Sequence, residues 1–295
     1  MKTEEGYIDF KGYNTYYIIY GNLKSKHTPL VILHGGPGYP HYYLENLGNL
    51  AKNGPPVILY DQLGCGKSDR PDNPELWTID LFIDELNTLR NSLGLLNINI
   101  LGHSWGGTLA LEYMFTKPQG VEKLILADPL VDTKLWVEEA RRLVNELPEW
   151  AADIMREHEV MGTTDPYEYK EAYAVFAKQH ICRAEPYPRD AIKSDIEMGH
   201  QPYNVMWGPN ETHVTGSLKD WTSLDRINEI KIPTLFISGK FDEASPKQIE
   251  AAQKLLPGSK WVLFENSSHM PHLEEPEKYL KVVEDFLGFS PASQG

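Results

Sequence analysis

Three residue types that together carry out nucleophilic acyl transfer occur along this chain in the order serine, acid, histidine. Ser104 lies in the segment GHSWG, which spans residues 102–106 and matches the pattern G-x-S-x-G. In this pattern a strand turns sharply into a helix, and glycines flank the serine because a Cβ there would clash. The turn holds the serine hydroxyl at the carboxyl end of a sheet. We therefore expect Ser104 to be the nucleophile of a hydrolase.

Asp242 and His269 are the candidates for the acid and the base of a catalytic triad. Each follows a short apolar run that we expect to form a strand. Open α/β sheets place their sites in the loops beyond such strand ends. In the implied mechanism His269 removes the proton of Ser104 and returns it to the leaving group, while Asp242 orients the imidazole. Glu243 is the alternative to Asp242 as the acid.

The segment HGGPG, residues 34–38, follows the first expected strand of the parallel sheet. A loop of this composition lets its backbone approach the nucleophile and donate to an oxyanion. We expect the N–H groups of Gly36 and Trp105 to form the oxyanion hole, although a plain turn would also explain the glycines. The segment DQLGCG, residues 61–66, we interpret as a structural loop near the mouth of the site.

Short apolar runs that end in glycine-rich turns recur along the chain and predict strands buried on both faces of a parallel sheet. Segments with helical spacing, such as 78–93 and 108–116, lie between them. This alternation predicts an α/β fold with a mostly parallel, doubly wound sheet. The expected elements are a hairpin over 7–20, strands over 29–33, 57–60, 98–101, 124–126, 233–237 and 260–264, and a closing helix over 278–286.

The alternation stops after Pro129. Residues 133–200 are rich in Glu, Arg, Ala, Trp and Tyr with helical spacing and no strand-like run, and a less regular continuation reaches about Asp220. We interpret this segment as a helical cap inserted into the core. The expected division is 1–130 for the first part of the core, 131–222 for the cap and 223–295 for the second part of the core.

The charge and composition argue against several classes of partner. The chain has 42 acidic and 28 basic residues, for a net charge of −14, and lacks the clustered basic surface that nucleic acids need. No apolar run approaches the roughly 20 residues that span a bilayer. The histidines show no convergent metal-ligand spacing. We therefore expect no nucleic-acid partner, no membrane, no metal and no cofactor.

The N-terminal segment and the cysteines indicate the cellular compartment in which we expect the protein. The first residues lack the positive and apolar regions of a signal peptide. Cys65 and Cys182 are too few for a disulfide framework, so we expect free thiols. Together these features predict a cytoplasmic protein.

Five segments carry a resemblance to a known family. The chain resembles the prolyl aminopeptidases (proline iminopeptidases) of the α/β-hydrolase fold, and within them the archaeal tricorn-interacting aminopeptidases. This resemblance covers nearly the whole chain. It implies an α/β-hydrolase core with a helical cap, no metal requirement, and the release of N-terminal residues, proline or broader, from short peptides or aminoacyl amides. The segments are HGGPG at 34–38, DQLGCGKS at 61–68, GHSWGG at 102–107, WGPNETHVTGSLKDW at 207–221 and GKFDEASP at 239–246.

The resemblance gives two further acids a role. It implies that Glu211 and Glu243 hold the free α-amino group of the substrate, whereas the sequence alone favours Glu211 as a solvated residue of the cap. An ammonium entering a partly dry pocket needs an opposite charge, which agrees with the implied role. The resemblance also makes a larger protease complex a candidate partner.

Two other functions share these motifs. A small-molecule amidase, esterase or lactonase of the same fold would use the same triad, so only Glu211 and Glu243 favour a substrate that carries an amine. A non-catalytic binding protein of this fold would not need an intact triad and oxyanion loop.

Overall fold

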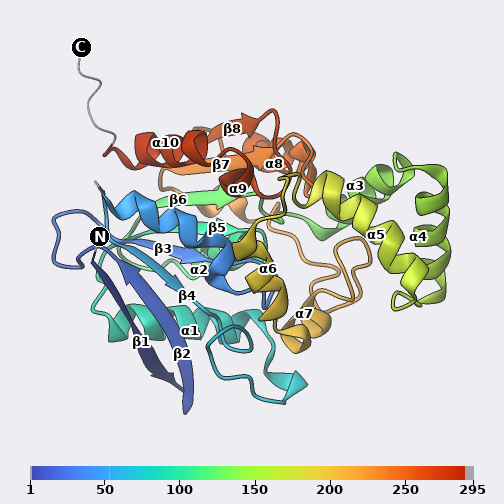
Figure 1. The fold of residues 1–295 in the computed structure, drawn as a ribbon. Coiled ribbons are helices and arrows are strands. Elements are labelled where there is room, and N and C mark those ends of the chain that lie inside the picture. Colours follow the sequence, from blue (N-terminus) through green and yellow to red (C-terminus); the bar gives the residue numbers. More distant parts are fainter. Residues whose placement is uncertain (1, 53, 290–295) are drawn as a thin grey trace.

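The computed structural model describes residues 2–52 and 54–289 of the 295-residue chain. An eight-stranded sheet forms its centre, in the order β1-β2-β4-β3-β5-β6-β7-β8 (Figure 1). The hairpin β1–β2 joins β4 in antiparallel pairing, and the remaining strands pair in parallel. The predicted α/β-hydrolase fold class is confirmed. The strands are β1 (Thr3–Phe10), β2 (Tyr13–Tyr20), β3 (Leu30–Leu33), β4 (Val57–Tyr60), β5 (Ile98–His103), β6 (Val121–Ala127), β7 (Thr234–Gly239) and β8 (Lys260–Phe264).

The inner parallel strands are largely buried on both faces, as their continuous apolar sequences predict, whereas the edge strand β8 is only partly buried. Successive side chains of a strand point to opposite faces of a sheet. In β3, Val31 and Leu33 therefore belong to one core, together with side chains of α1 (Ile79–Ser92), α2 (Trp105–Phe115) and α8 (Ser245–Leu255). Leu30 and Ile32 belong to a second core, on the other face, with η1 (His41–Lys52) and α10 (Pro276–Leu287). The sheet is thus doubly wound.

The helical boundaries have local causes. The Oγ1 of Thr78 accepts a hydrogen bond from the N–H of Leu81 and caps α1. Helix α2 begins directly after Ser104, three residues before the start that the sequence pattern indicates. The pattern gave no sign of η1 or α8. The remaining short elements are η2 (Pro74–Leu76), η3 (Ile227–Glu229) and α9 (Pro271–Glu274).

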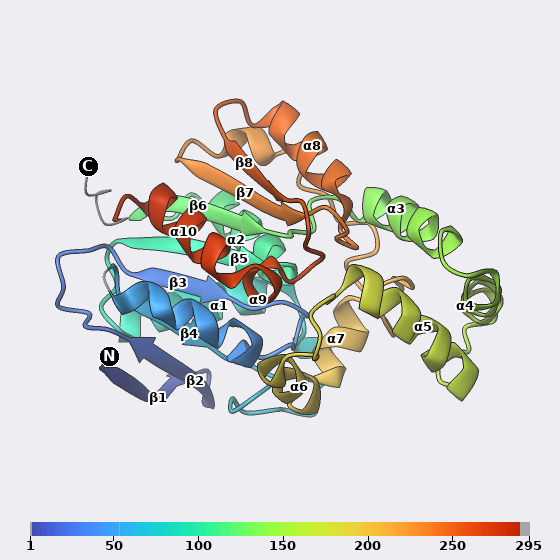
Figure 2. The ribbon, with the colours of Figure 1, turned by 45° about the horizontal axis from the view of Figure 1, so that its top comes forward.

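Five α-helices lie between β6 and β7, where the sequence predicts an insertion. Figures 1 and 2 show them gathered at one side of the sheet. Within residues 2–52 and 54–289, no helix is both long and apolar enough to cross a membrane. The inserted helices are α3 (Thr133–Asn145), α4 (Glu149–Met161), α5 (Tyr167–His180), α6 (Arg189–Ile196) and α7 (His200–Met206).

Candidate active site

Ser104 occupies the sharp turn between β5 and α2 that the motif predicts. Its backbone has φ 56° and ψ −122°, a conformation that L-residues rarely adopt. A Cβ on Gly102 would lie 2.2 Å from the carbonyl oxygen of Gly106, and a Cβ on Gly106 would lie 2.0 Å from that of Leu33. Both flanking positions therefore require glycine, and the strain at Ser104 is held by close packing on either side.

Asp242 and His269 are joined directly. The His269 Nδ1 lies 2.7 Å from the Asp242 Oδ1, and both side chains are buried. This contact leaves the Nε2 of His269 for the proton of a nucleophile. Ser104 and His269 line the same cavity, and no hydrogen bond connects their side chains within the described part of the chain. Such catalytic hydrogen bonds often tighten only when substrate binds.

The electrostatics of this site favour a basic imidazole. Burial alone would lower the pKa of His269, but the neighbouring carboxylates, Asp242 first, outweigh it and raise that pKa above its ordinary value. A general base of this kind loses activity as the pH falls through its pKa. The acid limb of activity is therefore expected above the ordinary pKa of a histidine.

Gly36 and Trp105 lie where the sequence places the oxyanion hole. Gly36 has φ 110°, and a Cβ there would lie 2.5 Å from the Gly38 nitrogen. Gly36 also lines the cavity beside Ser104. Trp105 is the first residue of α2, so its N–H has no partner within the helix. Both N–H groups therefore remain available to a developing oxyanion.

A buried chain of hydrogen bonds, which we call the relay, connects the HGGPG loop to His269. The Tyr43 hydroxyl, from η1, accepts from the N–H of Gly35 at 2.8 Å and donates to the Nδ1 of His103 at 2.9 Å. The Nε2 of His103 in turn donates to the carbonyl of His269 at 2.8 Å. His103 immediately precedes the candidate nucleophile. One chain of contacts thus fixes three loops of the site relative to one another.

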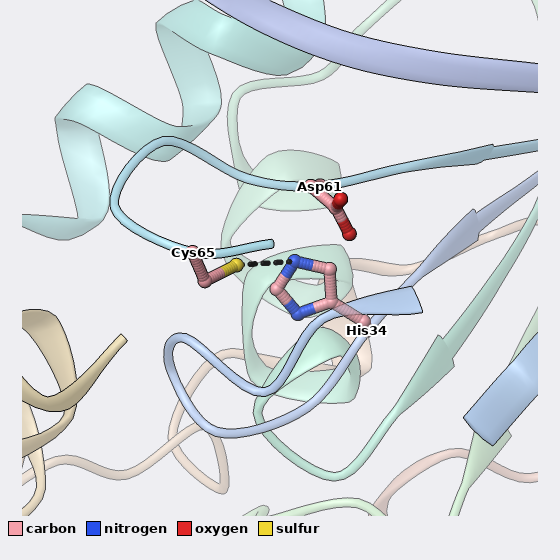
Figure 3. Close-up of side chains that lie close together, drawn as sticks. All are labelled: His34, Asp61 and Cys65. Carbon is pink, nitrogen blue, oxygen red and sulfur yellow. Dashed lines mark hydrogen bonds between the residues drawn. The ribbon is translucent and has the colours of Figure 1, made fainter. Parts of the chain in front are cut away.

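The loop after β4 has a bracing role, as the sequence analysis favours. Figure 3 shows His34, Asp61 and Cys65, whose potential metal-ligand atoms all lie within 4.8 Å of one another. The Nε2 of His34 already accepts from the N–H of Gln62 at 2.9 Å and lies 3.5 Å from the Cys65 Sγ. Asp61 accepts from the ring and the backbone N–H of His41. Burial also raises the pKa of the Cys65 thiol, which keeps it protonated. Hydrogen bonds within the protein account for this cluster.

Glu211 and Glu243 line the cavity that Ser104 and His269 also line. The Oε1 of Glu211 accepts from the Tyr203 hydroxyl at 2.5 Å. The Oε1 of Glu243 lies 3.8 Å from the His269 Nε2, and its buried Oε2 has no hydrogen-bond partner among the residues that the structure describes. Burial raises the pKa of both carboxyls, and repulsion from Glu211 and Asp242 raises that of Glu243 further. Two poorly compensated carboxyls therefore face one space.

The cavity has a volume of about 580 Å³, within the range usual for small-ligand sites. Much of its wall comes from α5 to α7 and the segment that follows α7. A smaller pocket opens from Ser104 and Glu211, and we call it the aromatic pocket. It is lined by the side chains of Trp105, Leu130, Trp136, Trp207 and Leu218.

Several of these residues were not predicted from the sequence. Trp136 lies at the centre of the aromatic pocket, and its Nε1 donates to the Glu211 carbonyl at 3.0 Å. Nothing in its local sequence distinguishes it from a core residue of α3. Three other aromatic residues lie near the site: Trp105 and Trp207 line the aromatic pocket, and Tyr203 lines the larger cavity. Tyr42 is buried beside His41.

The chain is similar to known proteins over nearly its whole length. A family model described as the alpha/beta hydrolase fold matches residues 28–276. A proline iminopeptidase of Heyndrickxia coagulans is 43% identical over 284 residues, which are 96% of this chain and 98% of that protein. The crystal structure of VinJ matches with a TM-score of 0.93 at 39% identity, covering 96% of this chain and 98% of that one. The crystal structure of the Mycobacterium smegmatis proline iminopeptidase matches with a TM-score of 0.89 at 36% identity, covering 96% and 97%.

Proposed function

This chain belongs to the proline iminopeptidase family of the α/β-hydrolase fold, and we propose that it acts as a serine aminopeptidase. We propose that it releases N-terminal residues, proline or others, from short peptides through an acyl-enzyme on Ser104. The observation that carries the proposal is the meeting of two carboxyls, Glu211 and Glu243, in the cavity that Ser104 and His269 line.

The chemistry follows from the arrangement of the triad. His269 takes the proton of Ser104 as the hydroxyl oxygen attacks the carbonyl carbon of the first residue, and the N–H groups of Gly36 and Trp105 bind the oxyanion. His269 then gives the proton to the leaving amine, which separates from the acyl-enzyme. Water enters, His269 removes its proton, and hydrolysis frees Ser104. Asp242 stabilises the imidazolium in both steps.

The acids of the cavity select for a free amino terminus. No lysine or arginine pairs with Glu211 or Glu243 among the described residues. Burial and the repulsion from Glu211 and Asp242 raise the pKa of Glu243, and an incoming ammonium would relieve that repulsion. A blocked amino group would bring neither the positive charge nor the N–H donors of an ammonium. The pair therefore distinguishes an aminopeptidase from an esterase.

The aromatic pocket presents an apolar wall beside Ser104, and its free volume of about 10 Å³ must widen before a side chain can enter. The rings of Trp136 and Trp207 meet edge to face with centroids 5.3 Å apart, and their side chains are almost completely buried. A compact closed ring such as pyrrolidine would lose less rotamer freedom against this wall than a long flexible chain. Proline is therefore the side chain that we propose for this pocket.

The setting of the reaction completes the proposal. The substrates are short peptides or aminoacyl amides, and a larger protease complex would be a suitable source of them. Both cysteines of the chain, Cys65 and Cys182, are free and buried, which fits the cytoplasmic location that we propose.

A panel of substrates tests the proposed function. Prolyl and alanyl amides should be cleaved faster than N-blocked amides, and a fluorophosphonate probe should label the wild type. Ser104→Ala should lose at least about 10³-fold in turnover, and the probe should no longer label it. Ser92→Ala, an exposed serine at the end of α1, is the control and should behave as the wild type. Near-normal hydrolysis by a folded Ser104→Ala protein would remove the assignment of the nucleophile.

A further inference from the structure

Asp128 is a buried acid next to the candidate triad, and the mechanism above does not use it. It directly follows β6, so it lies at the same edge of the sheet as the loops that carry Ser104 and Asp242. Its backbone is left-handed, with φ 48°, and its side chain is completely buried. The N–H of Gly239 donates to its Oδ1 at 3.0 Å, while its Oδ2 has no hydrogen-bond partner in the described part of the chain.

Asp242 also has one unpaired carboxylate oxygen. Its Oδ1 accepts from the ring of His269 and from the N–H of Ala244, whereas its buried Oδ2 has no partner among the described residues. A carboxylate oxygen of Asp128, one of Asp242 and a ring nitrogen of His269 all lie within 4.8 Å of one another. Each acid therefore has one unpaired oxygen, and the two carboxyls are neighbours.

Among residues 2–52 and 54–289, no lysine or arginine pairs with Asp128 or Asp242 to compensate a second negative charge. The Nε2 of His103 lies 3.9 Å from the Asp128 Oδ2, but burial lowers the pKa of His103 well below its ordinary value. Two ionised carboxylates in contact in a dry interior repel each other strongly, and a single shared proton removes that repulsion. Glu274 of α9 adds a further acid to the surroundings. The titratable groups that face Asp128 are Asp242, His269, His103 of β5, Tyr43 of η1, Glu274 of α9 and Tyr279 of α10.

A metal ion shared by these three side chains does not fit their spacing. Two ligands of one zinc ion each lie about 2.0–2.2 Å from it, so their atoms are normally about 3 Å or more apart. The Nδ1 of His269 and the Oδ1 of Asp242 are 2.7 Å apart, which is the distance of a direct hydrogen bond. A proton held between Asp128 and Asp242 would give a hydrogen-bond partner to the unpaired oxygens of both carboxyls.

We propose that Asp128 is a protonated carboxylic acid that donates a hydrogen bond to Asp242 and thereby positions the acid of the triad. The proposal rests on the proposed function, because it takes Asp242 and His269 as the acid and base. Burial first, and then the proximity of Asp242, hold the pKa of Asp128 well above its usual range. Asp128 thus fixes the rotation of the Asp242 carboxylate while adding no second charge beside His269.

Two substitutions distinguish a protonated Asp128 that positions Asp242 from an Asp128 that is negatively charged and from one that only maintains the fold. Asp128→Asn keeps an acceptor for Gly239 and a donor for Asp242, and asparagine tolerates a left-handed backbone. Asp128→Ala removes both. The control is Glu85→Gln, which changes another fully buried acid that lies on α1 and does not line the cavity. Hydrolysis of p-nitrophenyl acetate is measured against pH, because this ester reports on the triad whether or not the natural substrate is a peptide.

The expected result is a rescue by asparagine. Asp128→Ala should lower kcat about 10- to 100-fold with little change in KM, whereas Asp128→Asn should stay within about threefold of the wild type. The acid limb of Asp128→Asn should coincide with that of the wild type and of Glu85→Gln. A downward shift of that limb by about one pH unit or more in Asp128→Asn would overturn the proposal, because it would mean that a negative charge had been removed. Full kcat in Asp128→Ala would overturn it as well. If Asp128→Ala does not fold, the pH profile of Asp128→Asn decides alone.

These outcomes are distinct from a failure of the proposed function. A wild-type protein that hydrolyses the ester but not aminoacyl amides would contradict the aminopeptidase proposal and leave the role of Asp128 open to the same test. An infrared difference spectrum between the wild type and Asp128→Asn gives an independent readout. At neutral pH this difference spectrum should show the loss of one carboxylic-acid carbonyl band in the variant, and the absence of such a loss would count against the proposal.

Discussion

Asp242 and Glu243 are adjacent in the sequence, yet their side chains have different surroundings. Asp242 pairs with the Nδ1 of His269 at 2.7 Å, whereas the Oε1 of Glu243 lies 3.8 Å from the opposite ring nitrogen, Nε2. The sequence analysis predicted Asp242 as the acid and kept Glu243 as the alternative, because a sequence does not show which of two neighbouring acids turns toward the histidine. The geometry supports Asp242 as the acid and leaves Glu243 for the substrate.

The two roles predict different losses on substitution. Asp242→Asn should lower turnover about 10⁴-fold on every substrate, because an amide at this place favours the wrong tautomer of His269. Glu243→Gln should retain hydrolysis of a simple ester and lose activity mainly on substrates with a free amine. Steady-state kinetics on both substrate types, with circular dichroism as a check of folding, measure this. The reverse pattern would show that the two assignments are exchanged.

Glu85 is a buried acid that affects the stability of the fold. Its Oε1 accepts from the Thr15 hydroxyl at 2.6 Å and from the N–H of Leu63 at 2.9 Å. Burial raises the pKa of Glu85 to about 8, while the unfolded chain has the ordinary value near 4.5. Between these values the unfolded chain has released a proton that the folded protein still holds. The free energy of unfolding therefore falls as the pH rises through this window.

Glu85→Gln should remove this contribution. The variant should gain stability relative to the wild type as the pH rises from about 5 to about 8, by up to about 1.4 kcal/mol for each pH unit. Denaturant unfolding of both proteins at several pH values in that range measures the difference. A difference that does not depend on pH would mean that Glu85 is ionised in the folded protein.

At the scale of elements, η1 ties the oxyanion loop to β5 through Tyr43. Removing the Tyr43 hydroxyl would leave the N–H of Gly35 and the Nδ1 of His103 without partners in a buried place. Tyr60 of β4 is equally buried, but its hydroxyl has no hydrogen-bond partner among the described residues. Replacing each tyrosine by phenylalanine therefore removes a buried hydroxyl that has hydrogen-bond partners in one case and none in the other.

We expect Tyr43→Phe to lower the free energy of unfolding by about 1–3 kcal/mol and to reduce kcat. Tyr60→Phe should be neutral or slightly stabilising, since it removes an unpaired polar group. Chemical denaturation and ester hydrolysis of the two variants provide the comparison. Equal effects of both substitutions would argue against the relay.

The strands and the relay also show what a sequence does and does not reveal. The short apolar runs predicted each parallel strand closely, because burial on both faces demands continuous apolar residues. The relay could not be predicted, since its hydrogen bonds join residues that are 8, 60 and 166 positions apart. The sequence offered one signal that Asp128 could belong to the site: like Asp242, it follows an apolar run. The sequence could not show whether a carboxylate oxygen of Asp128 contacts another acid, because that depends on packing.

At the scale of the whole molecule, the inserted helices both enclose the cavity and support the site. The carbonyl of His180, at the end of α5, accepts from the N–H groups of Glu243 and His269, each at 3.2 Å. The carboxyl end of α5 therefore contacts two loops of the candidate site. Helices α5 to α7 also supply much of the wall of a cavity of about 580 Å³. A cap of this kind restricts substrates by size.

The size limit is a testable consequence. Aminoacyl amides and short peptides should be cleaved, and folded proteins or long denatured chains should be resistant, because a long chain cannot thread beneath the helices without disturbing the contacts of His180. Mass spectrometry of a digest of a denatured protein, beside a series of peptides of increasing length, measures the limit. Efficient digestion of the denatured protein would contradict the role of the cap.

The central claim is that Glu211 and Glu243 make this hydrolase specific for a free amino terminus. The most direct test compares kcat/KM for a prolyl amide and its N-acetylated form, with the wild type and with Glu211→Gln. Glu185→Gln is the control, since Glu185 lines the same cavity but pairs with Lys178.

Acetylation should lower kcat/KM of the wild type about 10- to 1000-fold, because a charge-assisted hydrogen bond contributes on the order of 1.5–3 kcal/mol and an unpaired buried charge costs more. Glu211→Gln should lose most of this preference, and Glu185→Gln should keep it. Equal rates of the wild type on the free and the acetylated substrate would contradict the account and favour an amidase or esterase.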